Sequence, residues 1–282
     1  MNTKRILITG GSGFVGKNLI EILSLKYNIT SLSHEQLDLT KQDSVNNFFK
    51  RFEPFDVIIH SANLGGKRNK KDGADVTSGN LRMFYNILSN STHYKKMISF
   101  GSGAEYAKNR PIINIAETKF GEVVPQDYYG FSKYVQAKYI ETQENITNLR
   151  IFGLFGKYED SSFRFISYSI LRNLKRLPII INQNVFFDYV LIDDFINIVD
   201  YFIKHDGKFE SYNIGSGRRI DLVEISKIIN RVSGFESKIV IKKKGYANEY
   251  TCNISRLQKE IPSLSFTPME ESVKKLFEYY TR

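Results

Sequence analysis

Glycines spaced three apart follow the first apolar run of the chain, and this feature constrains the fold more than any other. Residues 6–9, Ile-Leu-Ile-Thr, lead directly into residues 10–16, Gly-Gly-Ser-Gly-Phe-Val-Gly. Between a strand and a helix, such glycines permit a tight turn and a close backbone approach to a diphosphate at the N-terminus of the helix. The pattern predicts dinucleotide binding, with cofactor contacts from Gly10, Gly13, Phe14, Val15 and Gly16.

Short apolar segments alternate with helical stretches through the first half of the chain. The strand-like runs lie at residues 6–9, 29–32, 57–60, 97–100 and 149–152. This alternation predicts βαβ units and an α/β fold, a doubly wound parallel (Rossmann) sheet with a smaller C-terminal substrate-binding domain. We place the dinucleotide-binding domain at residues 1–155, with a returning segment near 186–203, and the substrate domain at 156–282.

The end of the second strand bears on which cofactor is bound. An acidic residue there would bind the ribose 2′-hydroxyl of NAD and repel a 2′-phosphate. The chain has Ser33 and His34 near this place, and both can donate hydrogen bonds to a phosphate. Glu35 follows one or two positions too late, although a small shift would bring it into place. We therefore favour NADP and keep NAD as the alternative.

A tyrosine and a lysine four residues apart form the second signal. Tyr129 and Lys133 would share one face of a helix, so both can reach one ligand. The ammonium is expected to lower the pKa of the phenol, which would make Tyr129 a usable proton donor near neutral pH. Tyr134 and Lys138 repeat the spacing, but lie roughly 140° further around the helix. We favour Tyr129 because it begins the helix, where access is easiest.

Small residues follow the strand-like run at residues 97–100. Ligands of a doubly wound sheet bind beyond the carboxyl ends of the strands, so Ser102 is expected at the mouth of the pocket. Its hydroxyl could bond the reacting oxygen and orient that oxygen toward Tyr129. We expect Ser102 and Gly103 to contact substrate, and Ser102, Tyr129 and Lys133 to form the catalytic set.

With these motifs in place, the chain resembles the extended short-chain dehydrogenases of the NAD-dependent epimerase/dehydratase family, which modify nucleotide-linked sugars. The similarity covers nearly the whole chain, and its motifs occur in the family's order. The matching residues are Gly10, Gly13 and Gly16, Asp38-Leu39, His60-Ser61-Ala62, Asn80, Ser102, Tyr106, Tyr129, Lys133, Leu149-Arg150, Asp188-Tyr189-Val190, Asp193-Asp194 and Tyr212-Asn213-Ile214-Gly215.

The resemblance also implies roles for cofactor-binding residues that the motifs alone do not give. Asp38 and Leu39 would flank the adenine, and Ser61 and Ala62 would back the nicotinamide ribose. Asn80 belongs to the same cofactor-binding set. The resemblance further implies that Ser102, Tyr129 and Lys133 carry the hydride-transfer chemistry.

Departures from the family patterns narrow the reaction. Sugar 4,6-dehydratases carry an acidic pair directly after the catalytic Ser or Thr, whereas this chain has Gly103 and Ala104, and Glu105 comes one place late. GDP-fucose synthase-like enzymes use a cysteine two residues after the serine to epimerise beside a carbonyl, and here that position is Ala104. Dehydration and this carbon-acid epimerisation are both disfavoured.

Two reactions need only Ser, Tyr, Lys and a nicotinamide. One is the reduction of a nucleotide-linked keto-(deoxy)sugar by NADPH, with Tyr129 as proton donor, and we favour it. The other is 4-epimerisation by transient oxidation, with tightly held NAD. A third possibility is a regulator that only senses the dinucleotide, but such proteins typically lack the Tyr/Lys pair.

Substrate binding is less clearly marked. Many relatives carry an arginine just before the motif that here reads Asp188-Tyr189, whereas this chain has Phe187. Capture of the diphosphate of a nucleotide-sugar substrate must then fall to other cations. We select Arg164 and Arg218, with Arg172 and Lys175 as further candidates.

Composition and charge bear on the remaining questions of partners, membrane association and cellular compartment. The net charge is +10, with basic clusters at residues 67–71 and 242–244, but neither lies in a nucleic-acid-binding motif, so no nucleic-acid partner is expected. No apolar run is long enough to span a bilayer, so we expect no membrane association. The single cysteine, Cys252, fits a reducing cytoplasm, and no metal site is expected. Resemblance alone implies a homodimer, formed through helices near residues 80–88 and 129–143.

Overall fold

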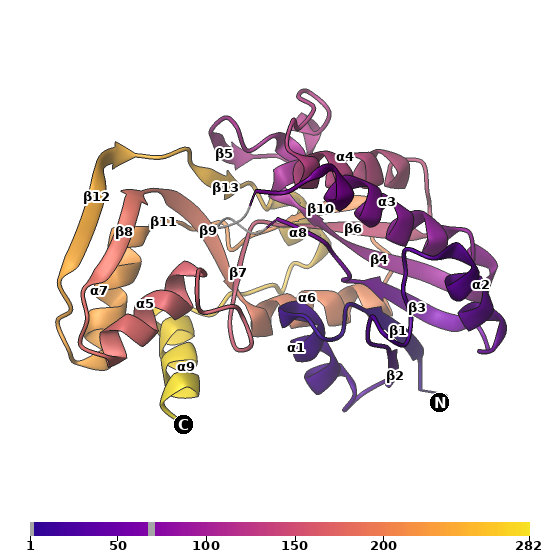
Figure 1. Cartoon of the computed structure of the whole chain (residues 1–282), viewed down its shortest axis with the longest axis horizontal. Coiled ribbons are helices and arrows are strands. Elements are labelled where there is room, and N and C mark those ends of the chain that lie inside the picture. Colours follow the sequence, from indigo (N-terminus) through magenta and orange to yellow (C-terminus); the bar gives the residue numbers. More distant parts are fainter. Residues whose placement is uncertain (1–2, 67–70) are drawn as a thin grey trace.

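The computed structural model describes residues 3–66 and 71–282; most of the basic cluster at residues 67–71 lies outside them. A six-stranded sheet forms one half of the molecule (Figure 1). Every pairing within this sheet is parallel, as the alternating sequence pattern predicted. Its strands, in spatial order, are β10 (Ser211–Ile214), β6 (Ile146–Ile151), β4 (Tyr94–Ser102), β3 (Phe55–His60), β1 (Arg5–Thr9) and β2 (Asn28–Ser31).

Helices cover both faces of this sheet, which confirms the doubly wound α/β Rossmann-type fold (Figure 1). On one face lie α2 (Gln42–Lys50), α3 (Ala74–Leu88) and α4 (Tyr128–Ile140), and on the other lie α1 (Phe14–Leu23) and α6 (Ile192–Lys204). Alternate strand residues point to opposite faces. In β1, Ile6 and Ile8 belong to the core under α1 and α6, whereas Leu7 packs with Phe84 of α3.

The second half of the chain builds a smaller region beside the sheet. A five-stranded sheet contains, in order, β11 (Arg219–Asp221), β9 (Phe186–Leu191), β13 (Tyr250–Cys252) and β5 (Ile112–Ile115), with β7 (Gly153–Phe155) also paired to β9. A parallel pair, β8 (Ile179–Asn184) and β12 (Ile239–Tyr246), projects from it. The helices of this half are α5 (Phe165–Leu174), α7 (Leu222–Ser233), α8 (Ser255–Glu260) and α9 (Met269–Thr281).

The chain returns to the large sheet twice after residue 155. Helix α6, inside the expected segment 186–203, covers one face of the sheet, and β10 beyond that segment adds the last strand beside β6. The strand at 186–191 belongs instead to the second sheet, where it pairs with β11 and β13. Both the large sheet and the smaller region are therefore built from segments before and after residue 155.

The strand order fixes where a ligand can bind. β2 lies on one side of β1 and β3 on the other, so the chain changes direction across the sheet between these strands. At such a switch point the loops after neighbouring strands separate and leave a crevice at their carboxyl ends. The glycine-rich turn follows β1 at this point. Across the described residues, no helix has the length and apolarity needed to cross a membrane.

Candidate active site

The turn after β1 contains glycines at which any side chain would displace neighbouring backbone atoms. Gly10 has a φ of +71°, and a Cβ on it would lie 2.7 Å from the backbone of Ala62. A Cβ on Gly16 would lie 2.2 Å from the carbonyl oxygen of Gly10, so the absence of a side chain lets α1 pack against the turn. Gly13 is the N-cap of α1. The first N–H groups of the helix therefore open onto the turn, as an anion-binding terminus requires.

A cavity of about 250 Å³ lies beside this turn. Leucines and a methionine supply its apolar wall, as suits a flat aromatic base. Among the described residues that line it, none is an aspartate or a glutamate. The sequence-predicted cofactor residues found here are Gly10, Gly13, His34, Leu39, Ser61 and Ala62.

Ser33, Asp38 and Asn80 are among the predicted cofactor residues that lie outside the walls of this cavity. The Ser33 hydroxyl accepts from the backbone N–H of Gln36 and faces a separate shallow hollow. The Asp38 carboxylate turns toward Thr40, whose hydroxyl and backbone N–H both donate to it. Asn80 binds the backbone of Leu64 through its carbonyl at 2.8 Å and its amide at 3.0 Å. Asn80 thus holds the loop after β3.

A larger cavity of about 570 Å³ adjoins the first, and Ser61 and Asn63 line both. It brings together all three predicted catalytic residues, Ser102, Tyr129 and Lys133. Phe14 and Val15, at the start of α1, also line this cavity rather than the smaller one. A ligand running from the glycine turn into the larger cavity would therefore reach the catalytic residues.

Ser102 ends β4 and begins a 3-10 turn, η2 (Gly103–Tyr106). Its hydroxyl accepts a hydrogen bond from the N–H of Ala104 at 3.1 Å, and its own N–H donates to Glu105 at 2.8 Å. These reciprocal bonds form a capping box. The backbone on both sides of the hydroxyl is thereby fixed. Gly103 follows without a side chain because a Cβ there would lie 2.6 Å from the Tyr250 hydroxyl.

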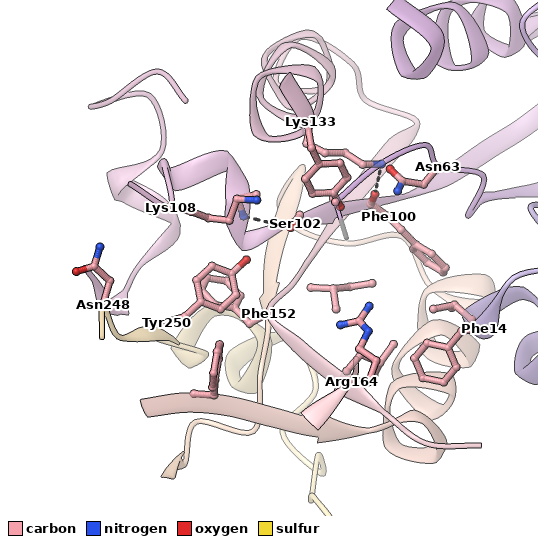
Figure 2. Close-up of a pocket in the computed structure, with 18 of the residues that line it drawn as sticks. Phe14, Asn63, Phe100, Ser102, Lys108, Lys133, Phe152, Arg164, Asn248 and Tyr250 are labelled. Carbon is pink, nitrogen blue, oxygen red and sulfur yellow. Dashed lines mark hydrogen bonds between the residues drawn. The ribbon is translucent and has the colours of Figure 1, made fainter. Parts of the chain in front are cut away.

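Tyr129 lies in the first turn of α4, and its pKa differs from our expectation. Burial raises the pKa of Tyr129 to about 12, and a hydrogen bond with Ser102 opposes this only in part. We expected the ammonium of Lys133 to lower this pKa, but burial dominates in the folded chain and the net shift is upward. Lys133 instead donates to the carbonyl of Phe100 at 2.8 Å, as Figure 2 shows. Tyr129 therefore holds its proton throughout the physiological range.

Lys133 is itself perturbed, because its side chain is buried. Burial lowers its pKa to about 8, and the negative charge of Glu105 acts in the opposite direction. The competing pair at Tyr134 and Lys138 has no such environment. Tyr134 packs against Phe120 with ring centroids 5.1 Å apart, and Lys138 binds Glu141 at the surface. Of the two pairs, only Tyr129 and Lys133 line the cavity.

Several cations line the larger cavity. Figure 2 shows the Arg164 guanidinium directed into the cavity, with Lys108 and Tyr250 on the wall opposite Phe14. Arg110 also lines the cavity, and its Nε is buried without a hydrogen-bond partner among the described residues. The one carboxylate among the described lining residues belongs to Glu249, which already binds Arg219 at 2.9 Å. The cavity thus favours an anionic ligand.

The two predicted diphosphate-binding arginines lie in different places. Arg164 is the N-cap residue of α5 and lines both the large cavity and a neighbouring one of about 540 Å³. Arg218 lines a separate hollow beside Cys252, so it is removed from the site. Phe187, where relatives carry an arginine, is 4% exposed and packs against Tyr250. The position is filled by an aromatic cluster instead of a charge.

Sequence reasoning missed several residues of this cavity. Lys108 and Arg110 follow Ser102 by six and eight positions, and a basic pair so soon after the catalytic strand was a usable signal. Asn63, directly after the matched motif at Ser61 and Ala62, could have been found in the same way. Tyr250 could not, because it lies far along the chain in a three-residue strand, β13, with no motif around it.

The sequence model of the NAD dependent epimerase/dehydratase family matches residues 6–215 of this chain. The chain belongs to this family. The match runs from β1 to the end of β10 and covers every element that places the predicted catalytic residues. Family membership confirms the resemblance noted from the motifs, and with it a fold built around a nicotinamide dinucleotide.

Individual relatives are more distant. The chain is 27% identical to a GDP-L-fucose synthase from Sinorhizobium fredii, over 85% of this chain and 83% of the relative. It is 24% identical to a dTDP-4-dehydro-6-deoxyglucose reductase from Escherichia coli, with 96% of each chain covered. Among solved structures, a GDP-mannoheptose C4 reductase from Campylobacter jejuni with NADP bound superposes with a TM-score of 0.84, at 21% identity and with both chains fully covered. At that identity the superposition supports the fold alone.

Proposed function

We propose that this protein reduces a nucleotide-diphosphate-linked keto-sugar with NADPH. The observation that carries the proposal is one cavity lined by Ser102, Tyr129 and Lys133 and also by Arg164, whose guanidinium points into it. A substrate with a reducible carbonyl and a diphosphate matches this distribution of groups. Relatives named as reductases and synthases of GDP- and dTDP-linked deoxysugars support the same class of reaction.

The residues of the chain account for the proton side of this reaction. Ser102 donates a hydrogen bond to the keto oxygen and orients it, while Tyr129 gives its proton to that oxygen as it becomes an alkoxide. A phenol with a pKa of about 12 remains protonated until an alkoxide, which is a stronger base, develops beside it. The nicotinamide, when bound, supplies the hydride. Lys133 keeps a positive charge near the phenol and lowers the cost of the phenolate that remains.

Reduction is favoured over dehydration or epimerisation beside the carbonyl because a second proton-transfer group is not available at the loop after Ser102. The two positions that carry such groups in relatives are Gly103 and Ala104. Glu105 is fully buried and accepts hydrogen bonds from backbone and side-chain donors, so it does not meet the substrate. The remaining groups can deliver one proton to one oxygen.

NADPH is favoured over NADH by the small cavity. A ribose 2′-hydroxyl is usually bound by a carboxylate at the end of the second strand. The described lining has His34 there and no acidic side chain, which suits a 2′-phosphate. The solved C4 reductase with this fold was found with NADP bound.

A 4-epimerase is the second candidate. The chain is 25% identical to a putative UDP-glucose 4-epimerase from Methanocaldococcus jannaschii, over 96% of each chain. Epimerisation by transient oxidation needs the same Ser, Tyr and Lys, and it consumes no cofactor overall. A regulator that only senses the dinucleotide is disfavoured, because it has no use for Tyr129 and Lys133 beside a cavity that favours an anionic ligand.

The test is the absorbance of NADPH and NADH with a panel of GDP-, dTDP- and UDP-linked 4-keto-6-deoxysugars. We expect stoichiometric loss of NADPH with at least one of these substrates and slower loss of NADH. A second substrate set consists of the corresponding nucleotide-linked 4-hydroxy sugars. Their interconversion without net loss of either cofactor would support the epimerase instead. Cofactor binding without any turnover across both substrate sets would support the sensor.

A further inference from the structure

Glu105 is a charged side chain in the protein core, three residues after the catalytic serine. It is 0% exposed, and it is absent from the described lining of the large cavity. Burying a carboxylate costs several kcal/mol unless partners replace the lost water. A residue retained in this position therefore needs an explanation that neither substrate contact nor proton transfer provides.

The partners of Glu105 hold the backbone that carries Ser102. Glu105 Oε1 accepts the N–H of Ser102 at 2.8 Å, while the Ser102 hydroxyl accepts the N–H of Ala104 at 3.1 Å. In this reciprocal arrangement each side chain satisfies a backbone donor next to the other. Ser102 sits at the junction of β4 and η2, where the chain leaves the sheet. Glu105 thus binds the backbone N–H of the residue that carries the hydroxyl.

The neighbouring strand β6 holds Glu105 in turn. Arg150 Nε lies 2.5 Å from Glu105 Oε2, with the arginine side chain 1% exposed, and the Asn148 amide donates to the same carboxylate. The Arg150 guanidinium also lies 4.1 Å from the ring centroid of Phe120. Gly101 leaves room for the carboxylate, because a Cβ there would lie 2.2 Å from Glu105 Oε1. Two adjacent strands are therefore shaped around this one side chain.

We propose that Glu105 is a positioning residue that holds the Ser102 hydroxyl in line with Tyr129 and the substrate oxygen, with Arg150 as its buried counter-ion. The inference rests on the proposed function, since it assigns Ser102 a substrate carbonyl to orient. Glu105 itself stays in the core. Its hydrogen bonds act on the reaction through Ser102, whereas its charge also acts on Lys133.

Four proteins test this: the wild type, Glu105→Ala, Ser102→Ala and the double variant, with kcat and KM measured at saturating NADPH. Misplacement of a reacting group by about 1 Å can cost about a hundredfold in rate. We expect Glu105→Ala to lower kcat about a hundredfold with little change in KM. In the Ser102→Ala background the same change should have almost no further effect. If the losses of kcat in the two single variants multiply in the double variant, the inference is overturned, because Glu105 would then act other than through Ser102.

Rescue by glutamine separates hydrogen bonding from charge. Glutamine keeps an acceptor for the Ser102 N–H, so Glu105→Gln should recover most of the rate that Glu105→Ala loses. If the lone Arg150 charge unfolds this variant, the pair Glu105→Gln/Arg150→Met removes both charges and keeps the acceptor. A pair that folds but is as slow as Glu105→Ala would contradict the proposal. Glu122→Ala, at an exposed glutamate, is the control for removal of a negative charge.

A crystal structure of Glu105→Ala tests the inference without any substrate. We expect the Ser102 hydroxyl to lose its bond to the Ala104 N–H in this variant and to keep it in Glu105→Gln. An unmoved Ser102 in Glu105→Ala would overturn the positioning role. If instead the wild type reduces no keto-sugar while this displacement is seen, the proposed function fails and the positioning inference stands.

Discussion

At the scale of single residues, burial sets the chemistry of the catalytic groups more than their neighbours in sequence do. The i, i+4 spacing of Tyr129 and Lys133 was readable from the sequence, and so was their shared face. The direction of the Tyr129 pKa was not, because it depends on the removal of water from the phenol in the folded protein. Likewise, the motif order placed Ser102 at the pocket, but only the structure shows Glu105 fixing it.

The first prediction concerns the two tyrosines of α4. Tyr129→Phe removes the proton donor and should lower kcat about 10²–10⁴-fold. Its affinity for NADPH, measured by fluorescence titration, should stay within a few-fold of the wild type. Tyr134→Phe is the matched control, because that ring packs against Phe120 outside the cavity. Loss of activity in Tyr134→Phe with an active Tyr129→Phe would show that the wrong pair was chosen.

The second prediction is a pH dependence set by Lys133. Its pKa is lowered by burial to about 8, so the ammonium is present below that pH and lost above it. The rate should therefore be constant below about pH 7 and fall roughly tenfold per pH unit well above pH 8. Lys133→Arg keeps the charge at all these pH values and should flatten the profile at a lower absolute rate. A wild-type rate unchanged from pH 7 to 10 would contradict a role for the ammonium.

The third prediction compares two arginines named from the sequence. Arg164 reaches the large cavity and Arg218 does not. A hydrogen bond to a charged group contributes about 1.5–3 kcal/mol, so Arg164→Gln should raise the KM for the nucleotide-sugar by about tenfold or more. Arg164→Lys should recover part of the loss. Arg218→Gln should behave as the wild type in steady-state kinetics, and equal effects of the two substitutions would count against the assigned cavity.

At the scale of elements, the strands that could be predicted from the sequence are those with a run or period of apolar residues. Five strands of the large sheet have apolar runs that were visible in the sequence, whereas β10 was not predicted as a strand. β12 was not predicted, because it carries Lys242, Lys243 and Lys244 on an exposed edge. The two short strands β5 and β7, of four and three residues, were also missed, since so few residues form no period. Elements stabilised by a tertiary neighbour rather than by their own pattern need the structure.

The fourth prediction separates two requirements at Gly10 of the glycine turn, which are a positive φ and space for the backbone of Ala62. Gly10 and Gly234 have nearly the same φ, +71° and +69°, but a Cβ meets Ala62 at the first and nothing within 4 Å at the second. Gly234→Ala should cost only the strain of a left-handed residue, about 1–2 kcal/mol, or about 2–4 °C of Tm for each kcal/mol. Gly10→Ala should lower the Tm further and abolish NADPH binding. Equal Tm values for the two variants would show that close approach to Ala62 is unimportant.

At the scale of the whole molecule, two adjoining cavities connect a dinucleotide-binding turn with an anionic-ligand site. The fold class was predictable from strand and helix alternation, whereas the cavity was not, because its walls come from β4, α4, α5 and β13 together. Tyr85 of α3 and Phe131 of α4 are 37% and 39% exposed. A homodimer through these helices stays a prediction.

The most direct test of the central claim follows a label from cofactor to sugar. NADPH carrying deuterium at the position from which hydride is transferred is incubated with the keto-sugar that the enzyme consumes. The mass of the product sugar is then measured by mass spectrometry. The account predicts one deuterium in every product sugar, in step with the loss of NADPH. Unlabelled product formed while NADPH remains would contradict net reduction and leave epimerisation as the reaction of this site.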